Sequence, residues 1–173
     1  MMNKKVKSFT GIILISAVFI LIAIRIIYVN KIIYSVSSHR EYNIGDSFEY
    51  NGMQMQLSDY RIYKGEELNL QYNNELSGIV DEYDILFNLT IKNISDTKKQ
   101  YNASASGIMY GYESGGNTNP YLYKYFNPDI KGIVTLEKDE SKTITLVFPT
   151  NIDNENIEYV VSLYPENIKV KLK

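Results

Sequence analysis

Carboxylates and tyrosines are the side chains of this chain with the clearest potential for chemistry. Asp81, Glu82 and Asp84 form one acidic cluster, and a second cluster consists of Asn151, Asp153, Asn154 and Glu155. A pair of carboxylates suffices for glycoside hydrolysis, and several oxygen donors can bind calcium. The second cluster lacks the glycine and the distant glutamate of an EF-hand loop. Solvation of polar loops is therefore the favoured interpretation of both clusters, and calcium binding or catalysis is the alternative.

Most other catalytic and metal-binding arrangements lack their essential residues. The chain has one histidine, His39, and no cysteine. A Ser-His-Asp triad needs a histidine inside the folded domain, and a zinc site needs several histidine or cysteine ligands. Neither an H-E-x-x-H pair nor a Gly-rich phosphate loop occurs. The sequence thus predicts a protein that is not an enzyme, with no catalytic residues, no metal and no other cofactor.

Tyrosines recur at every second position on both sides of an expected turn at 114–117. They are Tyr110 and Tyr112 before it and Tyr121, Tyr123 and Tyr125 after it. If both segments are strands, each tyrosine set lies on one face of its strand. An exposed stripe of this kind could stack on sugars or contact a protein partner. Cross-strand packing of these rings is the structural alternative, and solvent exposure distinguishes the two.

The N-terminal segment predicts where the chain resides. Lys4, Lys5 and Lys7 precede an apolar run from Phe9 to Ile24, and every acidic residue follows position 40. As a helix this run is about 24 Å long, whereas extension to Val29 gives about 31 Å, close to the bilayer core of about 30 Å. With cations on the inner side, the pattern predicts a cytoplasmic segment 1–8 and a transmembrane signal-anchor helix 9–29.

The outer end of this helix carries a charge and aromatic rings. Arg25 lies where its stem can extend to the headgroups, and Tyr28 suits the interface. A cleaved signal peptide is the alternative, but its closest small-residue site, Ser35-Val36-Ser37, lies well beyond Ile24. We therefore expect a single-pass cell-membrane protein with a polar stalk at 30–41 and an extracellular domain at 42–173.

The remainder of the chain is acidic. Residues 41–173 contain 12 basic and 20 acidic side chains, which gives a net charge of about −8. Nucleic acid is therefore not an expected partner, because phosphate contacts need clustered lysine and arginine. An exported domain without cysteine must be held by its core alone. Together with abundant Ile, Asn, Lys and Tyr, this favours a Gram-positive bacterial cell surface.

Apolar residues in this domain alternate with polar ones almost throughout. Asn51-Gly52 is a strong hairpin signal, and a phase change near Ser58-Asp59 indicates a β-bulge. The clearest strand runs from Tyr83 to Ile91, and Leu86 interrupts its alternation. We expect a loop over 64–81 and no helix beyond the anchor. Short strands separated by regular turns predict an all-β fold, an immunoglobulin-like antiparallel β-sandwich.

A family resemblance follows from this order of segments. Tyr42-Asn43-Ile44-Gly45-Asp46 precedes the first hairpin, Ile91-Lys92-Asn93 ends the apolar strand, and Val147-Phe148-Pro149 ends a later one. The chain resembles the uncharacterised immunoglobulin-like (telokin-like) extracellular domains of Gram-positive surface proteins, which are related in fold to a secreted mycobacterial immunoprotective antigen. The resemblance implies the fold and supplies no catalytic residues. Many members are anchored to the membrane by a lipid-modified cysteine, which this chain lacks.

Three functional hypotheses remain. The favoured one is a non-catalytic, membrane-tethered domain that binds an extracellular protein or cell-wall component. The second is an accessory or immunity-type membrane protein that acts through its helix and Arg25. The third is a carboxylate-based hydrolase, which needs two acids that converge in a concave pocket.

Overall fold

The computed structural model describes residues 4–36, 38–110, 114–150, 156–163 and 166–172. Within this range the side chains of 4–14, 32–36, 38 and 114 are not described. The chain divides into two compact units. One contains the N-terminal helix, and the other comprises Arg40–Leu163 and Asn167–Lys173.

The first unit is built on one long helix, α1 (Lys4–Val36), of 33 residues. Its described large apolar side chains are exposed, for example Phe19 at 68% and Leu21 at 65%. Across the residues whose side chains are described, which in this helix are 15–31, no helix has the length and apolar character needed to cross a membrane. The helix continues to Val36 and a strand begins at Ser38, so helix and strand occupy much of the stalk expected at 30–41.

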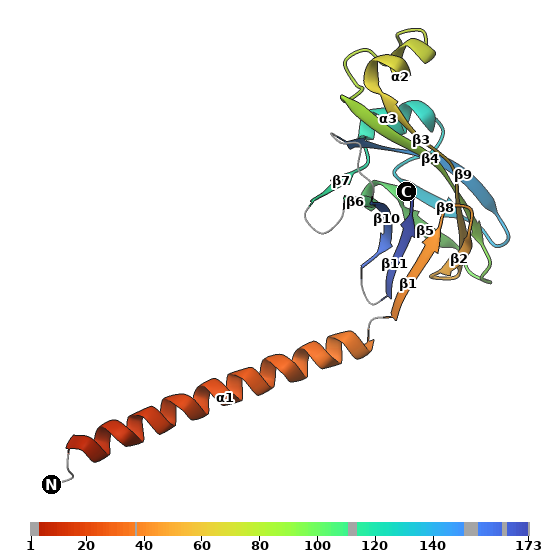
Figure 1. The fold of residues 1–173 in the computed structure, drawn as a ribbon. Helices are drawn as coiled ribbons and strands as arrows, with labels where there is room; N and C mark the ends of the chain where they lie inside the picture. The colour runs from red at the N-terminus through yellow and green to blue at the C-terminus, as the bar shows by residue number, and fades with distance from the viewer. Residues whose placement is uncertain (1–3, 37, 111–113, 151–155, 164–165, 173) are drawn as a thin grey trace. The chain divides into compact units, whose positions relative to one another are not determined.

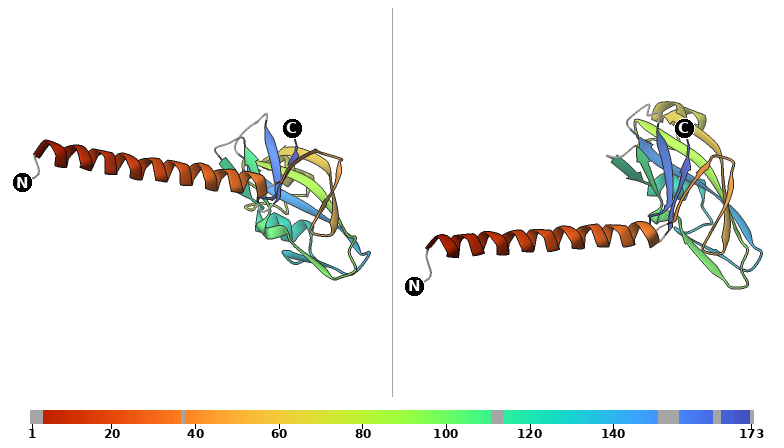
Figure 2. Two further views of the ribbon diagram at one scale, coloured as in Figure 1. Left: turned by 90° about the horizontal axis from the view of Figure 1, so that it is seen from below. Right: turned by 60° about the horizontal axis from the view of Figure 1, so that its bottom comes forward.

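The second unit contains two main sheets and a small third one (Figures 1 and 2). The five-stranded sheet has the order β1-β11-β10-β6-β7, the four-stranded sheet β2-β3-β4-β9, and the two-stranded sheet β5-β8. The strands are β1 (Ser38–Asn43), β2 (Ser47–Tyr50), β3 (Met53–Lys64), β4 (Tyr83–Asn93), β5 (Lys99–Asn102), β6 (Gly107–Tyr110), β7 (Ser114–Asn117), β8 (Ile133–Leu136), β9 (Ser141–Thr150), β10 (Ile157–Ser162) and β11 (Glu166–Lys171). The predicted all-β sandwich is confirmed.

Local sequence signals account for much of the four-stranded sheet. The Asn51-Gly52 turn joins β2 to β3 with both residues at positive φ, 50° and 74°, as a type I′ turn requires. The predicted bulge is confirmed, since the β3–β4 register shifts between Ser58 and Arg61 and Asp59 has φ 56°. Positive φ at Asp59 is uncommon for a non-glycine residue, and it accompanies the change of buried face along β3.

Helices occur where the sequence predicted none. The structure adds α2 (Gly65–Gln71), α3 (Pro120–Phe126) and a 3₁₀ turn, η1 (Ala103–Ala105). Both α-helices lie toward one end of the domain (Figure 1). The loop expected over 64–81 thus begins with a helix, and the turn expected at 114–117 is an edge strand paired with β6. These elements are short, and tertiary packing decides short segments more than local propensity does.

The core lies between the two main sheets. It joins Phe87 and Phe148 from the four-stranded sheet to Tyr159 from the five-stranded one. Ring centroids are 5.6 Å apart for Phe87 and Phe148 and 5.0 Å for Phe87 and Tyr159. A second cluster of Leu68, Leu76, Leu86, Leu122 and Val147 packs α2 and α3 on the opposite face of β4 and β9. Leu86 breaks the alternation of β4 because it belongs to this second cluster.

The buried side chain of Asn93 connects the turns at the ends of β4 and β8. Its Nδ2 donates to the carbonyl oxygens of Thr97, Leu136 and Glu137 at 2.8, 3.2 and 3.1 Å. Its Oδ1 accepts from the backbone N–H and the hydroxyl of Ser95 at 2.9 and 2.8 Å. One amide therefore satisfies buried backbone groups from two turns that are far apart in sequence.

We expect Asn93→Ala to destabilise the domain by about 3 kcal/mol, because several buried polar groups lose their partner. Asn102→Ala is the matched control, since Asn102 is exposed and its Oδ1 accepts one bond, from Ser104; it should cost less than about 1 kcal/mol. Urea unfolding followed by circular dichroism measures both. Equal losses in the two variants would contradict the role given to Asn93.

Candidate functional site

The five tyrosines predicted to form a stripe lie in different environments. Tyr110 is half-buried in β6, and its hydroxyl donates to the carbonyl of Pro149 at 2.6 Å. Tyr112 lies outside the described residues. Tyr121 is 70% exposed, Tyr123 is 6% exposed, and the Tyr125 hydroxyl donates to Glu75 at 2.6 Å. Residues 120–126 form the helix α3, so the strand assumed for Tyr121, Tyr123 and Tyr125 is wrong, and with it their shared strand face. Whether these rings bind a ligand stays a prediction.

The helix α3 forms here because of the two residues at its start. Pro120 occupies the beginning of the helix, where its missing N–H costs nothing. Asn119 caps it, since its Oδ1 accepts from the backbone N–H groups of Tyr121 and Leu122 at 3.1 and 3.2 Å. Asn followed by Pro is a recognised helix-start signal. The sequence therefore contained evidence for this helix, but the spacing of the tyrosines at every second position favoured a strand.

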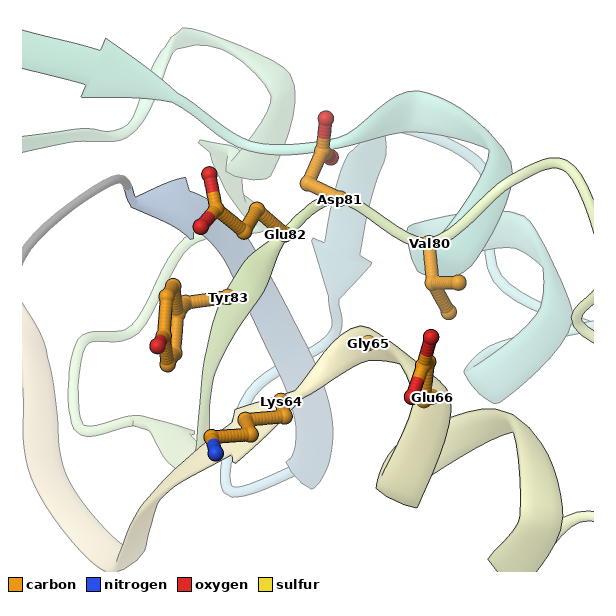
Figure 3. A pocket seen from close by; sticks show the side chains of 7 residues that line it. All are labelled: Lys64, Gly65, Glu66, Val80, Asp81, Glu82 and Tyr83. Atoms are coloured by element: carbon orange, nitrogen blue, oxygen red, sulfur yellow. The ribbon is translucent and has the colours of Figure 1, made fainter.

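The first acidic cluster borders an open pocket of about 320 Å³ at the junction of β3, α2 and β4 (Figure 3). It is lined by Lys64, Gly65, Glu66, Val80, Asp81, Glu82 and Tyr83. Gly65 and Asp81 lie near the middle of the pocket. Lys64 and Tyr83 extend to one side of them, and Glu66 and Val80 lie on the other side (Figure 3). Three carboxylates and one ammonium group line the pocket, so it suits a ligand that carries positive charge.

The segment at Gly65 can approach the backbone of Asp81 closely only because Gly65 has no side chain. A Cβ atom there would lie 2.0 Å from the carbonyl oxygen of Asp81. The Gly65 N–H donates to the carbonyl of Glu82 at 3.0 Å, which joins the start of α2 to the start of β4. No local sequence signal marks this glycine, because the close approach comes from Asp81, sixteen residues further along the chain.

Among the described residues, no three His, Cys, Asp or Glu side chains are grouped so that they could hold a metal ion. The carboxylate of Asp81 accepts from Asn119 Nδ2 at 3.0 Å, and that same amide also donates to the carbonyl of Ile79. The second predicted cluster, 151–155, lies outside the described residues.

Asp84 is set apart from its neighbours by burial. It is 0% exposed, and its Oδ2 accepts the backbone N–H of Asp81 at 3.0 Å. Its Oδ1 is buried without a hydrogen-bond partner in the described part of the chain. Burial is the main cause that raises the pKa of this carboxyl from 3.8 to about 6, against the lowering effect of the Asp81 N–H. Asp84 is thus a structural carboxyl at the start of β4.

Comparison with solved structures finds the same fold in bacterial proteins. The YjhA protein of Bacillus subtilis superposes with a TM-score of 0.53 at 13% identity, covering 76% of this chain and 99% of that one. MPT63, a secreted protein of Mycobacterium tuberculosis, superposes with a TM-score of 0.53 at 12% identity, covering 78% of this chain and 96% of that one. The resemblance expected from the sequence is confirmed, and at these identities it concerns the fold alone.

A third similar structure is an uncharacterised β-sandwich protein of Clostridium difficile, with a TM-score of 0.45 at 13% identity, covering 79% of this chain and 96% of that one. No protein-family model matches the sequence. No curated protein matches it significantly either.

We expect Asp84 to make stability depend on pH. The folded protein retains the Asp84 proton up to about pH 6, whereas the unfolded chain loses it near 3.8. Raising the pH through this window therefore removes stability, on the order of 3 kcal/mol in full. Asp84→Asn keeps the acceptor for Asp81 N–H and cannot ionise, so it should be more stable than the wild type above pH 6 and lose this dependence.

Urea unfolding at pH values on both sides of this window measures the difference between the wild type and Asp84→Asn. Asp96→Asn is the matched control, because the Asp96 side chain is 89% exposed. A pH dependence that is the same in the wild type and Asp84→Asn would contradict the burial argument.

We also expect Gly65→Ala to destabilise the domain by about 2 kcal/mol, because the new methyl group displaces the backbone at Asp81. At Gly107 the nearest atom would lie 3.7 Å from the added Cβ. Gly107→Ala is therefore the control, with an expected change below about 1 kcal/mol. Thermal unfolding compares the two, and an unchanged Gly65→Ala variant would exclude the close approach.

Proposed function

We propose that this protein is a single-pass membrane protein whose β-sandwich domain lies outside the cell and binds an extracellular protein or cell-wall component without catalysis. In this proposal α1 is an uncleaved signal-anchor, the domain is immunoglobulin-like, and the protein resides at the surface of a Gram-positive bacterium.

The observation that carries the proposal is the composition of α1. Its 33 residues correspond to about 50 Å of helix, more than the bilayer core of about 30 Å. Large apolar side chains are exposed along its described part, including Ile20 at 60% and Ile27 at 66%. A contiguous exposed apolar surface of this kind marks a site of contact with another protein or with a membrane. We propose that membrane lipid surrounds this helix. The run from Phe9 to Ile24 extends it toward the N-terminus.

The orientation follows from the distribution of charge. Lys4, Lys5 and Lys7 precede the apolar run, and a domain with a net charge of about −8 follows it. Cations favour the cytoplasmic side of a membrane, which puts the acidic domain outside. Arg25 and Tyr28 then stand toward the outer headgroups. An acidic domain is also repelled by anionic lipid, so it remains available to a partner in solution or in the wall.

A binding role is favoured over catalysis by the residues that the domain offers. The single histidine, His39, lies in β1 at the edge of the five-stranded sheet, and the chain has no cysteine nucleophile. The acids Asp81 and Asp84 are engaged in local hydrogen bonds that order the start of β4. The chemistry available at the surface is thus hydrogen bonding, stacking and charge attraction.

The absence of cysteine allows a direct test of this topology. Asp96→Cys, in the turn after β4, and Ser8→Cys, before the apolar run, each introduce the only thiol of the chain. We expect a membrane-impermeant maleimide to label Asp96→Cys in intact cells and Ser8→Cys only after lysis. The two variants serve as controls for each other.

The same samples test whether the anchor is retained. An uncleaved anchor keeps the full-length chain in the membrane pellet after carbonate extraction. The reverse labelling pattern, or full-length protein in the carbonate supernatant, would overturn the proposal. A shortened chain in the culture medium would instead identify a cleaved signal peptide.

A further inference from the structure

A second pocket of the domain differs in chemistry from the acidic one. It has a volume of about 210 Å³ and lies where three distant segments meet. Its lining consists of Tyr50, Asn51, Gln100, Tyr101, Asn102, Ala105, Ser106 and Val161. None of these residues is charged. They come from the β2–β3 turn, from β5 and η1, and from β10, so only the folded domain creates the pocket.

Three buried hydroxyl groups form a closed ring, and two of them belong to the lining residues Tyr101 and Ser106. Ser106 Oγ is 2.9 Å from the Tyr101 hydroxyl and 3.0 Å from the Tyr159 hydroxyl, and the two tyrosine hydroxyls are hydrogen-bonded to each other. Tyr101 and Ser106 are 6% and 4% exposed. Burial raises the pKa of Tyr101, and it raises that of Tyr159 further, so both hydroxyls stay protonated at neutral pH.

The hydrogen bonds within this ring leave its oxygens with acceptor capacity only. Each hydroxyl has one proton, and a closed ring of three uses all three protons internally. Each oxygen keeps a lone pair, so Tyr101 and Ser106 can accept a hydrogen bond from a ligand hydroxyl. This arrangement suits a ligand that brings its own donors.

The outer wall offers side chains that both donate and accept. The amides of Asn51 and Gln100 line the pocket and form no hydrogen bond with another described side chain or backbone group. Each primary amide supplies two donors and one acceptor in one plane. The ring of Tyr50 adds an aromatic wall with a polar tip. A sugar ring carries several hydroxyl groups and apolar C–H groups. It can therefore hydrogen-bond to neutral donors and acceptors and stack on an aromatic ring at the same time.

From this geometry we infer that the pocket formed by Tyr50, Asn51, Gln100, Tyr101 and Ser106 binds a neutral sugar residue. The volume is below the roughly 300 Å³ at which sites for drug-sized ligands begin, so it fits one ring. No lining residue is a cation that could pair with a carboxylate or a phosphate. An anionic ligand would therefore lose hydration free energy on binding without gaining an ion pair. The inference rests on the proposed function, since it names the class of cell-wall ligand that the domain would bind.

The test measures sugar binding by the full chain in lipid nanodiscs, because alkyl glycoside detergents would present sugar to the pocket. Saturation-transfer NMR is recorded with glucose, with N-acetylglucosamine and with glucuronate at millimolar concentrations. We expect saturation transfer to at least one neutral sugar. Glucuronate, which differs from glucose by a carboxylate, should bind about tenfold more weakly.

Matched glutamine variants locate the binding. Gln100→Ala should weaken binding about threefold to tenfold, the effect of one neutral hydrogen bond. Gln54→Ala, at an exposed position of β3 that does not line the pocket, should leave it unchanged. Circular dichroism verifies that both variants are folded, and their exposed positions make this the expected result.

Three results would overturn the inference: no saturation transfer from the wild type to either neutral sugar, equal affinity of Gln100→Ala and the wild type, or glucuronate binding as tight as glucose. Preference for N-acetylglucosamine would identify wall glycan as the source, and preference for glucose a hexose polymer. The nanodisc exposes the domain whichever side of the membrane it occupies in cells. Failure of sugar binding and failure of the proposed topology are therefore separate results.

Discussion

The amide of Asn93 is the interaction on which the arrangement of this domain depends most. It closes the turn after the central strand β4 and also binds the carbonyl oxygens at the end of β8. The backbone of Asn93 adds bonds to Glu140 and Asp139 at the start of β9. An apolar side chain at this position would leave those carbonyls buried and unpaired. The β5–β8 pair is thereby held at the end of the four-stranded sheet.

Two consequences follow for the surface of the domain. With β5 fixed by this turn, Tyr101 enters the core and reaches Tyr159 and Ser106, which creates the neutral pocket beside the β2–β3 turn. On the opposite face of β4, Leu86 supports α2 and α3, and this support brings Gly65 against Asp81 to form the acidic pocket. The domain thus presents two pockets of different charge, and both arise from contacts between segments distant in sequence.

How far each feature was predictable depends on the range of the interactions that produce it. Three features depend on residues that are close together in the sequence, and all three were predicted. They are the Asn51-Gly52 turn, the bulge at Asp59 and the buried face of β4. The period-two tyrosines at 121–125 predicted a strand, yet the cap at Asn119 and the packing of Leu122 produce a helix. The neutral pocket had no sequence signal, because Asn51, Gln100 and Ser106 approach one another only in the folded state.

By itself the sequence determined the sandwich fold, through alternation and turn residues that act over a few positions. It also determined the charge asymmetry between the first forty residues and the acidic remainder. Only the tertiary structure decided which polar groups are buried, such as Asp84 and the three ring hydroxyls, and which remain free at a pocket. The physical reason is that burial and the pairing of polar groups are set by neighbours from other strands, whose positions the local chain does not record.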